Sequence, residues 1–488
     1  MKKLLLGIVL LFVGSIYSHV YSQEGETVDK TVLKAAYDQY KEKAITHRRF
    51  KHKDIAPLIE QRMKGDLFEI SPLGSSVENR DIYQLSYGQG DRRVMLWSQM
   101  HGNESTATMS LFDLFNFLEG SDDEFEFIRK AINEKLDLRF IPMVNPDGAE
   151  AFIRRNAYEI DLNRDAIQLT SPEAVILRKA REDFSPQFGF NLHDQQIYYN
   201  VERTPKPATI SVLAPAFNYE TDINDVRKRA LQVIVGMNEL LQEIIPGQVG
   251  KYDDGFEQRA FGDNFQRWGT STILIESGGY PGDPDKQYIR ELNFMIILNA
   301  LYSIAKENYT QYDVADYFAI PDNDTKLMDV MLRNVTIKRD GLEYKVDLGI
   351  RRREIEGEES YYTESSITDV GDLSVFYGYD ELDADGYVMK EGKVWAEELK
   401  ALPTKKEVLE MLKKGFLGVK MKSENEIIHS LPINIIKPDG ELKSGHKLGN
   451  TANFFLEKDG RTDYALVNGY LIDLRSPKEQ RIKLKSQQ

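Results

Sequence analysis

The chain has 488 residues, of which 41% are apolar and 29% charged, which is the composition of a globular protein and not of a disordered or fibrous one. Because domains typically contain about 100–200 residues, the length predicts two or three of them. The net charge of -15 disfavours a nucleic-acid partner, and the absence of cysteine excludes disulfides, thiolate metal ligands and a cysteine nucleophile.

The first residues are typical of a secretory signal peptide. A short basic leader, Met1-Lys2-Lys3, precedes an apolar run from Leu4 to Val13. Such a run is about half as long as a bilayer-spanning helix, which disfavours the alternative of an uncleaved membrane anchor. We predict a signal peptide over residues 1–22 with cleavage near Ser22, a mature protein without a membrane span, and a secreted or periplasmic location.

Strands and helices alternate along the middle of the chain. Residues 23–65 have the apolar spacing of a helical segment, and residues 66–310 contain the alternating elements. Such alternation predicts an α/β domain in which helices cover both faces of one sheet. The predicted strands are 81–85, 93–98, 138–143, 188–192 and 272–276, and the predicted helices are 106–118, 171–183, 222–243 and 285–307.

The last third of the chain has a different pattern. Residues 311–329 include Pro321–Asp324, which is typical of a linker, and one helix is predicted beyond it at Lys405–Lys414. Residues 330–488 otherwise contain hairpin patterns with turns at Asp340-Gly341, Asp459-Gly460 and Asn468-Gly469. We therefore expect a smaller β-rich C-terminal domain, for which folding support, cell-wall binding and substrate recruitment are equally open roles.

Two histidines and a glutamate stand at the ends of predicted strands. His101 and Glu104 follow the strand that ends near Ser98, and His193 ends another apolar strand. Taken singly, the first pair could be a polar turn, and His193 a hydrogen-bonded boundary residue. Together, at the carboxyl ends of strands in one sheet, the three form the ligand set of a catalytic zinc site with an open fourth position.

Further charged residues follow strands or cluster in loops. Glu276 ends an apolar strand and precedes glycines. A charge at the end of an apolar strand costs free energy unless it has a function there, so we interpret Glu276 as a general base for a water molecule. The alternative is a salt-bridged helix start. The segments Arg154–Asn156 and Asp161–Asp165 carry arginines that would bind an anionic substrate end or a developing oxyanion, unless they simply lie on the surface.

The order of these motifs resembles that of one family. His-Gly-Asn-Glu, Asn-Pro-Asp-Gly, Arg-x-Asn, Asp-Leu-Asn-Arg, a strand-end histidine and a strand-end glutamate follow one another here as in the M14 family of zinc carboxypeptidases. The resemblance covers about residues 66–305 and starts with Gly74–Arg80, which is similar to the family's Gly-x-Ser-x-Glu-x-Arg turn. It implies a mixed eight-stranded sheet flanked by helices, and one Zn²⁺ per chain.

The same resemblance implies a role for each motif residue. Arg154 would polarise the scissile carbonyl, with Arg155 in its place if the alignment shifts by one residue. Tyr252 lies 24 residues before Glu276, near the position of the family's mobile tyrosine. The implied zinc ligands are His101, Glu104 and His193, the implied general base is Glu276, the implied carboxylate-binding residues are Asn163 and Arg164, and the candidates for the pocket floor are Phe261, Gly262 and Asp263.

The sequence therefore predicts an exported zinc metallocarboxypeptidase that hydrolyses the C-terminal peptide bond of peptides with a free carboxylate. One alternative is a related deacylase or amidase that acts on N-acyl amino acids or on cell-wall peptides. A second alternative is a non-catalytic protein that binds peptides or wall fragments, although such a protein would have no use for Glu276 beside a metal. The preferred C-terminal residue and the oligomeric state are left open.

Overall fold

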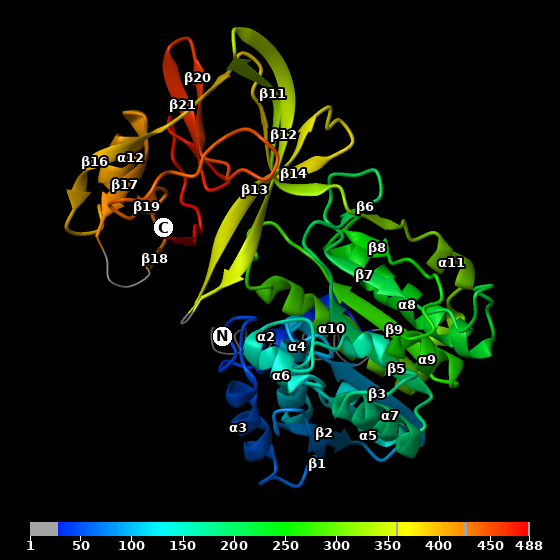
Figure 1. Cartoon of the computed structure of the whole chain (residues 1–488). Helices are drawn as coiled ribbons and strands as arrows, with labels where there is room; N and C mark the ends of the chain where they lie inside the picture. Colours follow the sequence, from blue (N-terminus) through cyan, green and yellow to red (C-terminus); the bar gives the residue numbers. More distant parts are fainter. Residues whose placement is uncertain (1–27, 358–359, 423–426, 487–488) are drawn as a thin grey trace, which may run out of the picture. The chain divides into compact units, whose positions relative to one another are not determined.

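The computed structural model describes residues 28–357, 360–422 and 427–486, and the predicted signal peptide lies outside them. The chain divides into two compact units, Met1–Asp324 and Thr325–Gln488, each of which is described by itself (Figure 1). In the described residues, no helix is long and apolar enough to cross a membrane.

One mixed sheet of eight strands forms the centre of the first unit. Its strand order is β1-β2-β4-β3-β5-β9-β7-β8. The four central strands β4, β3, β5 and β9 are parallel, whereas β1, β2 and β7 run antiparallel to a neighbour. The strands are β1 Glu69–Ser75, β2 Asp81–Tyr87, β3 Arg92–Ser98, β4 Leu136–Ile141, β5 Phe188–Asp194, β7 Ile210–Leu213, β8 Val249–Lys251 and β9 Ser271–Ser277, and β6 Asn200–Val201 pairs separately with β10 Asn323–Asp324.

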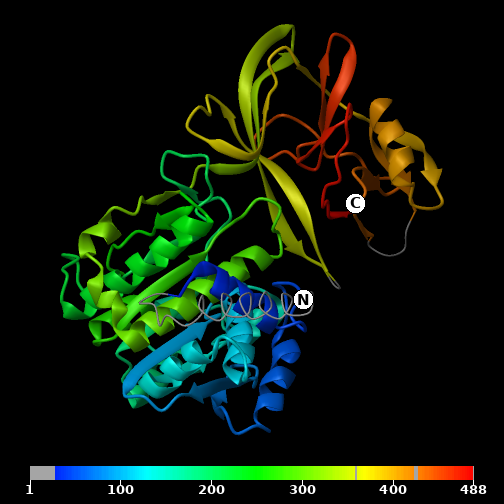
Figure 2. The same cartoon turned by 180° about the vertical axis from the view of Figure 1, so that it is seen from behind.

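Helices cover both faces of this sheet, as the predicted α/β fold requires (Figure 2). One apolar core joins one sheet face to α2, α4, α5, α8 and α10, and a second core joins the other face to α7 and α9. The helices are α2 Lys30–Tyr40, α3 His52–Arg62, α4 Thr106–Glu119, α5 Glu126–Lys135, α6 Pro146–Ala151, α7 Pro172–Phe184, α8 Asp225–Ile244, α9 Phe261–Arg267, α10 Gln287–Lys306 and α11 Val314–Phe318, with 3-10 turns at Leu162–Arg164 and Asn308–Gln311.

Most predicted elements of this unit form within a few residues of their expected bounds. The helix predicted from residue 222 begins at Asp225, because the Asn224 side chain accepts a hydrogen bond from the Arg227 amide and caps it there. Several elements have no predicted counterpart: strands β1, β6, β7, β8 and β10 and helices α5, α6, α9 and α11. Strands β7 and β8 have only four and three residues, which is too short for an alternating pattern to be recognised, whereas the buried Ile128, Ala131 and Ile132 of α5 have helical spacing that the prediction missed.

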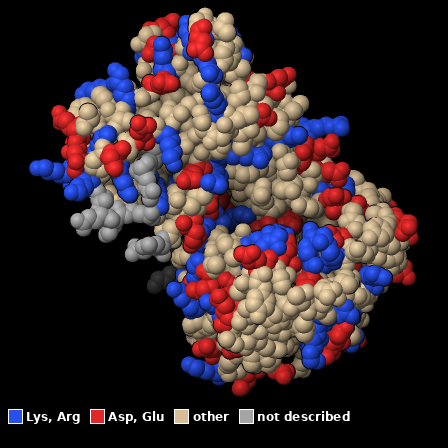
Figure 3. Space-filling model, viewed as in Figure 1, with Lys and Arg blue, Asp and Glu red and all other residues tan. Residues whose placement is uncertain are grey.

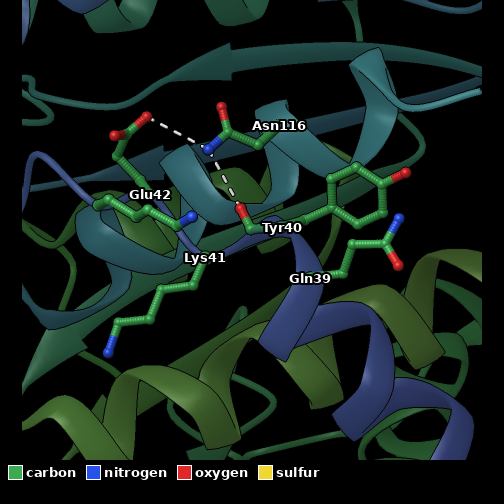
Figure 4. Close-up of a pocket in the computed structure, with 6 residues that line it drawn as sticks. Gln39, Tyr40, Lys41, Glu42 and Asn116 are labelled. Carbon is green, nitrogen blue, oxygen red and sulfur yellow. Dashed lines mark hydrogen bonds between the residues drawn. The ribbon is translucent and has the colours of Figure 1, made fainter.

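The N-terminal segment is fixed to α4 and α10 by polar contacts. Asn116 of α4 donates hydrogen bonds to the Tyr40 carbonyl at 3.1 Å and to the Glu42 carboxylate at 3.2 Å (Figure 4). In addition, Arg290 of α10 forms a fully buried ion pair with Asp113 of α4. Arg290 also donates to the carbonyl oxygens of Ile45 and Glu42, so one buried guanidinium joins two helices and a loop.

The second unit is rich in β-structure, as predicted. The three predicted turns join β11 to β12, β20 to β21 and β21 to β22, and each has positive φ at both central residues, which Asp-Gly and Asn-Gly tolerate. Its elements are β11 Leu327–Arg339, β12 Leu342–Glu356, β13 Tyr361–Gly371, β14 Tyr377–Asp383, β15 Val388–Lys390, β16 Lys393–Leu399, α12 Lys405–Lys413, β17 Phe416–Met421, β18 Ile428–His429, β19 Asn434–Ile436, β20 Phe454–Lys458, β21 Arg461–Val467, β22 Tyr470–Asp473 and β23 Leu484–Lys485.

Charged side chains of both signs are mixed over the face of the molecule that Figure 3 shows. The net charge of -15 is therefore not gathered into one acidic field on that face.

Candidate metal centre

Three buried side chains meet at the carboxyl ends of the central strands. His101 and Glu104 lie between β3 and α4, and His193 lies near the end of β5, the parallel neighbour of β3. His101 Nδ1 lies 2.8 Å from Glu104 Oε1, and His193 Nδ1 lies 2.7 Å from Glu104 Oε2. Among the described residues, this is the one group of three such side chains whose ligand atoms lie within 4.8 Å of one another.

The turn that carries His101 is held by close backbone packing. A Cβ added to Gly102 would lie 1.9 Å from the carbonyl carbon of Gly148, so only glycine fits where the turn contacts α6. Asn145, at the start of α6, donates a hydrogen bond to the Met100 carbonyl at 3.2 Å. The Asn-Pro-Asp-Gly segment is thus the start of a short helix that supports the histidine turn.

Asp161 and Arg154 surround the histidine–glutamate pair. His101 Nε2 lies 3.0 Å from Asp161 Oδ1, while Arg154 lies 3.1 Å from Glu104 Oε1 through Nη1 and 3.0 Å from Asp161 Oδ2 through Nε. Burial opposes the ionisation of Asp161, but the hydrogen bond and charge of His101 outweigh it and hold the pKa of Asp161 well below its usual value. Asp161 was not among the predicted site residues, although it begins the Asp-Leu-Asn-Arg motif.

Replacing Asp161 with Ala is expected to weaken metal binding by about 10–100-fold, because a carboxylate on the distal nitrogen fixes the orientation and tautomer of a ligating histidine. The measurement is the metal dissociation constant by competition with a chelator. Asp183→Ala is the matched control, since Asp183 makes only an exposed ion pair with Lys179. Equal affinities in the two variants would contradict a supporting role for Asp161.

Glu276 lies beside His193 on the neighbouring strand. The two residues are paired in the parallel register of β5 and β9, so their side chains project from the same face of the sheet. Glu276 Oε2 is buried and has no hydrogen-bond partner among the described residues. Burial raises the pKa of Glu276 well above its usual value, and the charges of Glu104 and Asp194 raise it further. Glu276 is therefore a half-buried acid, with one buried carboxylate oxygen, next to three potential ligands.

The structure separates the two candidate arginines. Arg154 turns towards Glu104 and Asp161, whereas Arg155 donates to the Glu159 carbonyl at 2.7 Å. Arg154 is therefore the arginine next to the ligand cluster.

Of the proposed substrate-binding residues, Asn163 and Arg164 lie in a 3-10 turn and Tyr252 lies in the loop after β8. Asn163 accepts a hydrogen bond from the Phe261 amide at 2.9 Å, so its side chain fixes the start of α9. Arg164 Nε lies 3.4 Å from Glu257 Oε2, and its side chain is 38% exposed, which leaves guanidinium donors accessible. The Tyr252 hydroxyl lies 3.1 Å from that of Tyr199, a residue that sequence reasoning missed.

The candidates for a pocket floor begin α9. Phe261 and Gly262 are buried, and a Cβ on Gly262 would lie 2.9 Å from Asn191 Nδ2. Burial raises the pKa of Asp263 to about 7. Two further residues that the sequence did not indicate, Asp194 and Lys286, form a buried ion pair behind the cluster.

Residues 59–199 match the family model Peptidase M14, described as zinc carboxypeptidase. Probable carboxypeptidase 2 of Trichophyton verrucosum is 27% identical over 192 residues, which are 39% of this chain and 33% of that protein. Carboxypeptidase 2 of Trichophyton tonsurans is 29% identical over 135 residues, or 28% of this chain and 23% of that protein. The matched region is thus a third or less of these two relatives' length.

Solved structures described as metallo-carboxypeptidases are also similar to this chain. A metallo-carboxypeptidase from Burkholderia cenocepacia is 17% identical with a TM-score of 0.41, covering 52% of this chain and 69% of that one. A metallo-carboxypeptidase from Pseudomonas aeruginosa is 20% identical with a TM-score of 0.40, covering 53% and 70%. Because these TM-scores are low, the fold is assigned from the sheet and helices of this chain and not from its similarity to the two structures.

Proposed function

We propose, on the premise that residues 59–199 belong to the zinc carboxypeptidase family, that this chain is a zinc-dependent carboxypeptidase. One observation carries the proposal. Glu276 of β9 is paired with His193 of β5, and His101 and Glu104, which follow the neighbouring strand β3, lie at the same edge of the sheet. A metal-binding group next to a half-buried acid is the arrangement that hydrolysis by an activated water requires. We also propose that the protein is exported by its predicted signal peptide.

The donor set fits one zinc ion per chain. His101 and His193 both turn Nδ1 towards Glu104, so two imidazole nitrogens and a carboxylate converge. Two histidines and one acid leave a fourth tetrahedral position open, as in catalytic zinc sites. When bound, zinc supplies a Lewis acid that polarises a carbonyl and lowers the pKa of water.

Glu276 then acts as the general base and acid. Its carboxylate takes a proton from the attacking water and delivers it to the leaving amine. The raised pKa of Glu276 arises from burial and from negative neighbours, and a bound cation would lower it by stabilising the carboxylate. Arg154, 44% exposed beside Glu104, donates to the oxyanion that develops on the scissile carbonyl.

Asn163 and Arg164 bind the free carboxylate of the substrate, and Tyr252 closes on the bound residue. A planar guanidinium presents two parallel donors to a carboxylate, which a lysine cannot copy. Glu257 forms an ion pair with Arg164, and this pair must break when the substrate carboxylate binds to Arg164. Cleavage is thereby restricted to the last peptide bond of the chain.

Replacing Arg164 with Lys is expected to raise KM for a peptide with a free C-terminus by about 10–100-fold, with a smaller change in kcat, because a charge-assisted bidentate contact is lost. The C-terminally amidated form of the same peptide is expected to be a poor substrate for both proteins. Arg155→Lys is the matched control, since Arg155 bonds only to a backbone carbonyl in its own loop. Equal cleavage of the free and amidated peptides by the wild type would contradict an exopeptidase.

The experiment that tests the function combines metal content with hydrolysis of a mixed peptide pool. We expect one zinc per chain, stepwise loss of C-terminal residues, and loss of activity after chelation that returns with added zinc. If the chain binds zinc and hydrolyses N-acyl amino acids but removes no residue from peptides, its activity is that of a deacylase and not of a peptidase. A chain that binds no zinc would contradict the proposal.

A further inference from the structure

A buried lysine stands immediately behind the strand ends that carry the site. Lys286 precedes α10, has a left-handed backbone with φ 50°, and is 6% exposed. Its Nζ lies 3.0 Å from Asp194 Oδ2 and 2.8 Å from the Ser277 carbonyl oxygen. Asp194 and Ser277 directly follow His193 and Glu276, so one ammonium group connects the ends of β5 and β9.

Asp194 extends these contacts to Glu104, in the turn before α4, and to the start of α4 itself. Its Oδ2 accepts a hydrogen bond from Thr106 Oγ1 at 2.5 Å, at the first residue of α4. Its backbone amide donates to Glu104 Oε2 at 3.2 Å. The Lys286–Asp194 pair therefore contacts the ends of β5 and β9, which carry His193 and Glu276, and Asp194 also contacts Glu104 itself and the start of α4.

Three features distinguish this pair from an ordinary stabilising contact. Backbone hydrogen bonds already join β5 to β9, so the pair is not needed to hold the strands together. A buried ion pair also contributes little net stability, because desolvation of both charges offsets their attraction. In addition, Lys286 has positive φ, a conformation that costs free energy in a non-glycine residue and that is found preferentially at functional sites.

We propose that Lys286 and Asp194 are positioning residues of the hydrolytic site, which fix the Glu104 and Glu276 carboxylates relative to each other. The proposal rests on the proposed function. Neither residue contacts substrate: Asp194 orients Glu104 through its amide, and Lys286 sets the position of Asp194 and of the end of β9. A zinc site needs such support, because small displacements of a ligand or of the base lower both affinity and rate.

The test replaces Lys286 with Met in the full chain and compares it with Lys286→Arg and with Arg129→Met. Arg129 is a matched control, because it is a buried cation in the same unit that bonds to a carboxylate, Asp123, and to a backbone carbonyl, that of Phe117. Three quantities are measured for each protein: the zinc dissociation constant by chelator competition, kcat and KM on one peptide, and the melting temperature.

We expect Lys286→Met to weaken zinc binding by about 10–100-fold and to lower kcat by a similar factor at nearly unchanged KM, as is typical when a supporting contact of a metal site is removed. Lys286→Arg is expected to retain part of the zinc affinity and part of kcat. Arg129→Met is expected to lower the melting temperature alone. If Lys286→Met also changes only the melting temperature, the proposal is overturned. Should Lys286→Met fail to fold, Lys286→Arg and Asp194→Asn undergo the same comparison, and unchanged zinc affinity and kcat in both would overturn it.

The outcomes separate this proposal from the proposed function. A wild type that binds zinc but trims no peptide would contradict the carboxypeptidase, and the zinc affinities of the variants would still decide the positioning role. Normal zinc affinity and kcat in the Lys286 variants of an active enzyme would contradict the positioning role alone.

Discussion

Replacing Glu276 with Gln is expected to lower kcat by about 10²–10⁴-fold, because the amide can neither accept a proton from water nor return it to the leaving amine. Zinc binding is expected to persist, since Glu276 is not one of the three converging ligands. The side chain keeps its size, and its buried Oε2 has no hydrogen-bond partner among the described residues whose loss would disturb the fold. The measurement is kcat on a peptide with a free C-terminus, together with zinc content.

Glu220→Gln is the control for this prediction, because Glu220 is an exposed residue in the loop before α8. It is expected to leave kcat and zinc content unchanged. A Glu276→Gln enzyme with wild-type kcat and a full complement of zinc would show that another group transfers the proton. A loss of zinc together with activity would instead move Glu276 into the metal-binding group.

Replacing Arg290 with Met is expected to destabilise the first unit by about 3–5 kcal/mol, because it leaves the carboxylate of Asp113 buried without its partner. Both residues are fully buried, and Arg290 also donates to the Ile45 carbonyl at 2.6 Å. The free energy of unfolding is measured in urea from the fluorescence of Trp97 and Trp268, which both belong to this unit, with Trp395 of the second unit replaced by Phe. Arg290 bonds to Asp113 and to the carbonyl oxygens of Ile45 and Glu42, none of which is a proposed zinc ligand, so zinc affinity at low temperature is expected to be retained.

The double variant Asp113→Leu with Arg290→Met is the informative companion. When both charges are replaced by apolar groups of similar size, no uncompensated charge remains, and most of the lost stability is expected to return. If the double variant is as unstable as Arg290→Met, the hydrogen bonds of Arg290 to the loop carbonyls, and not the buried charge, hold the N-terminal segment in place.

The sequence was sufficient for the α/β fold and for the identity of the residues that converge. His101, Glu104 and His193 each follow a recognisable apolar strand, and the ends of parallel strands share one edge of a sheet. Because this rule needs only the strand pattern, the cluster could be predicted without coordinates. The Asp-Gly and Asn-Gly turns of the second unit were predictable for a similar reason, since positive φ restricts the residue type locally.

Contacts between residues that are distant in the chain were decided by the tertiary structure alone. The choice of Arg154 over Arg155 depends on which side chain turns towards Glu104, and neighbouring arginines look alike in a sequence. Lys286 and Asp194 are 92 residues apart, and nothing in the spacing of either indicates the other. Local patterns report backbone preference and burial, whereas a buried pair depends on where two elements pack. Thus the sequence was enough to indicate the three potential ligands and Glu276, whereas the packing of α10 against the strand ends determined which side chains surround them.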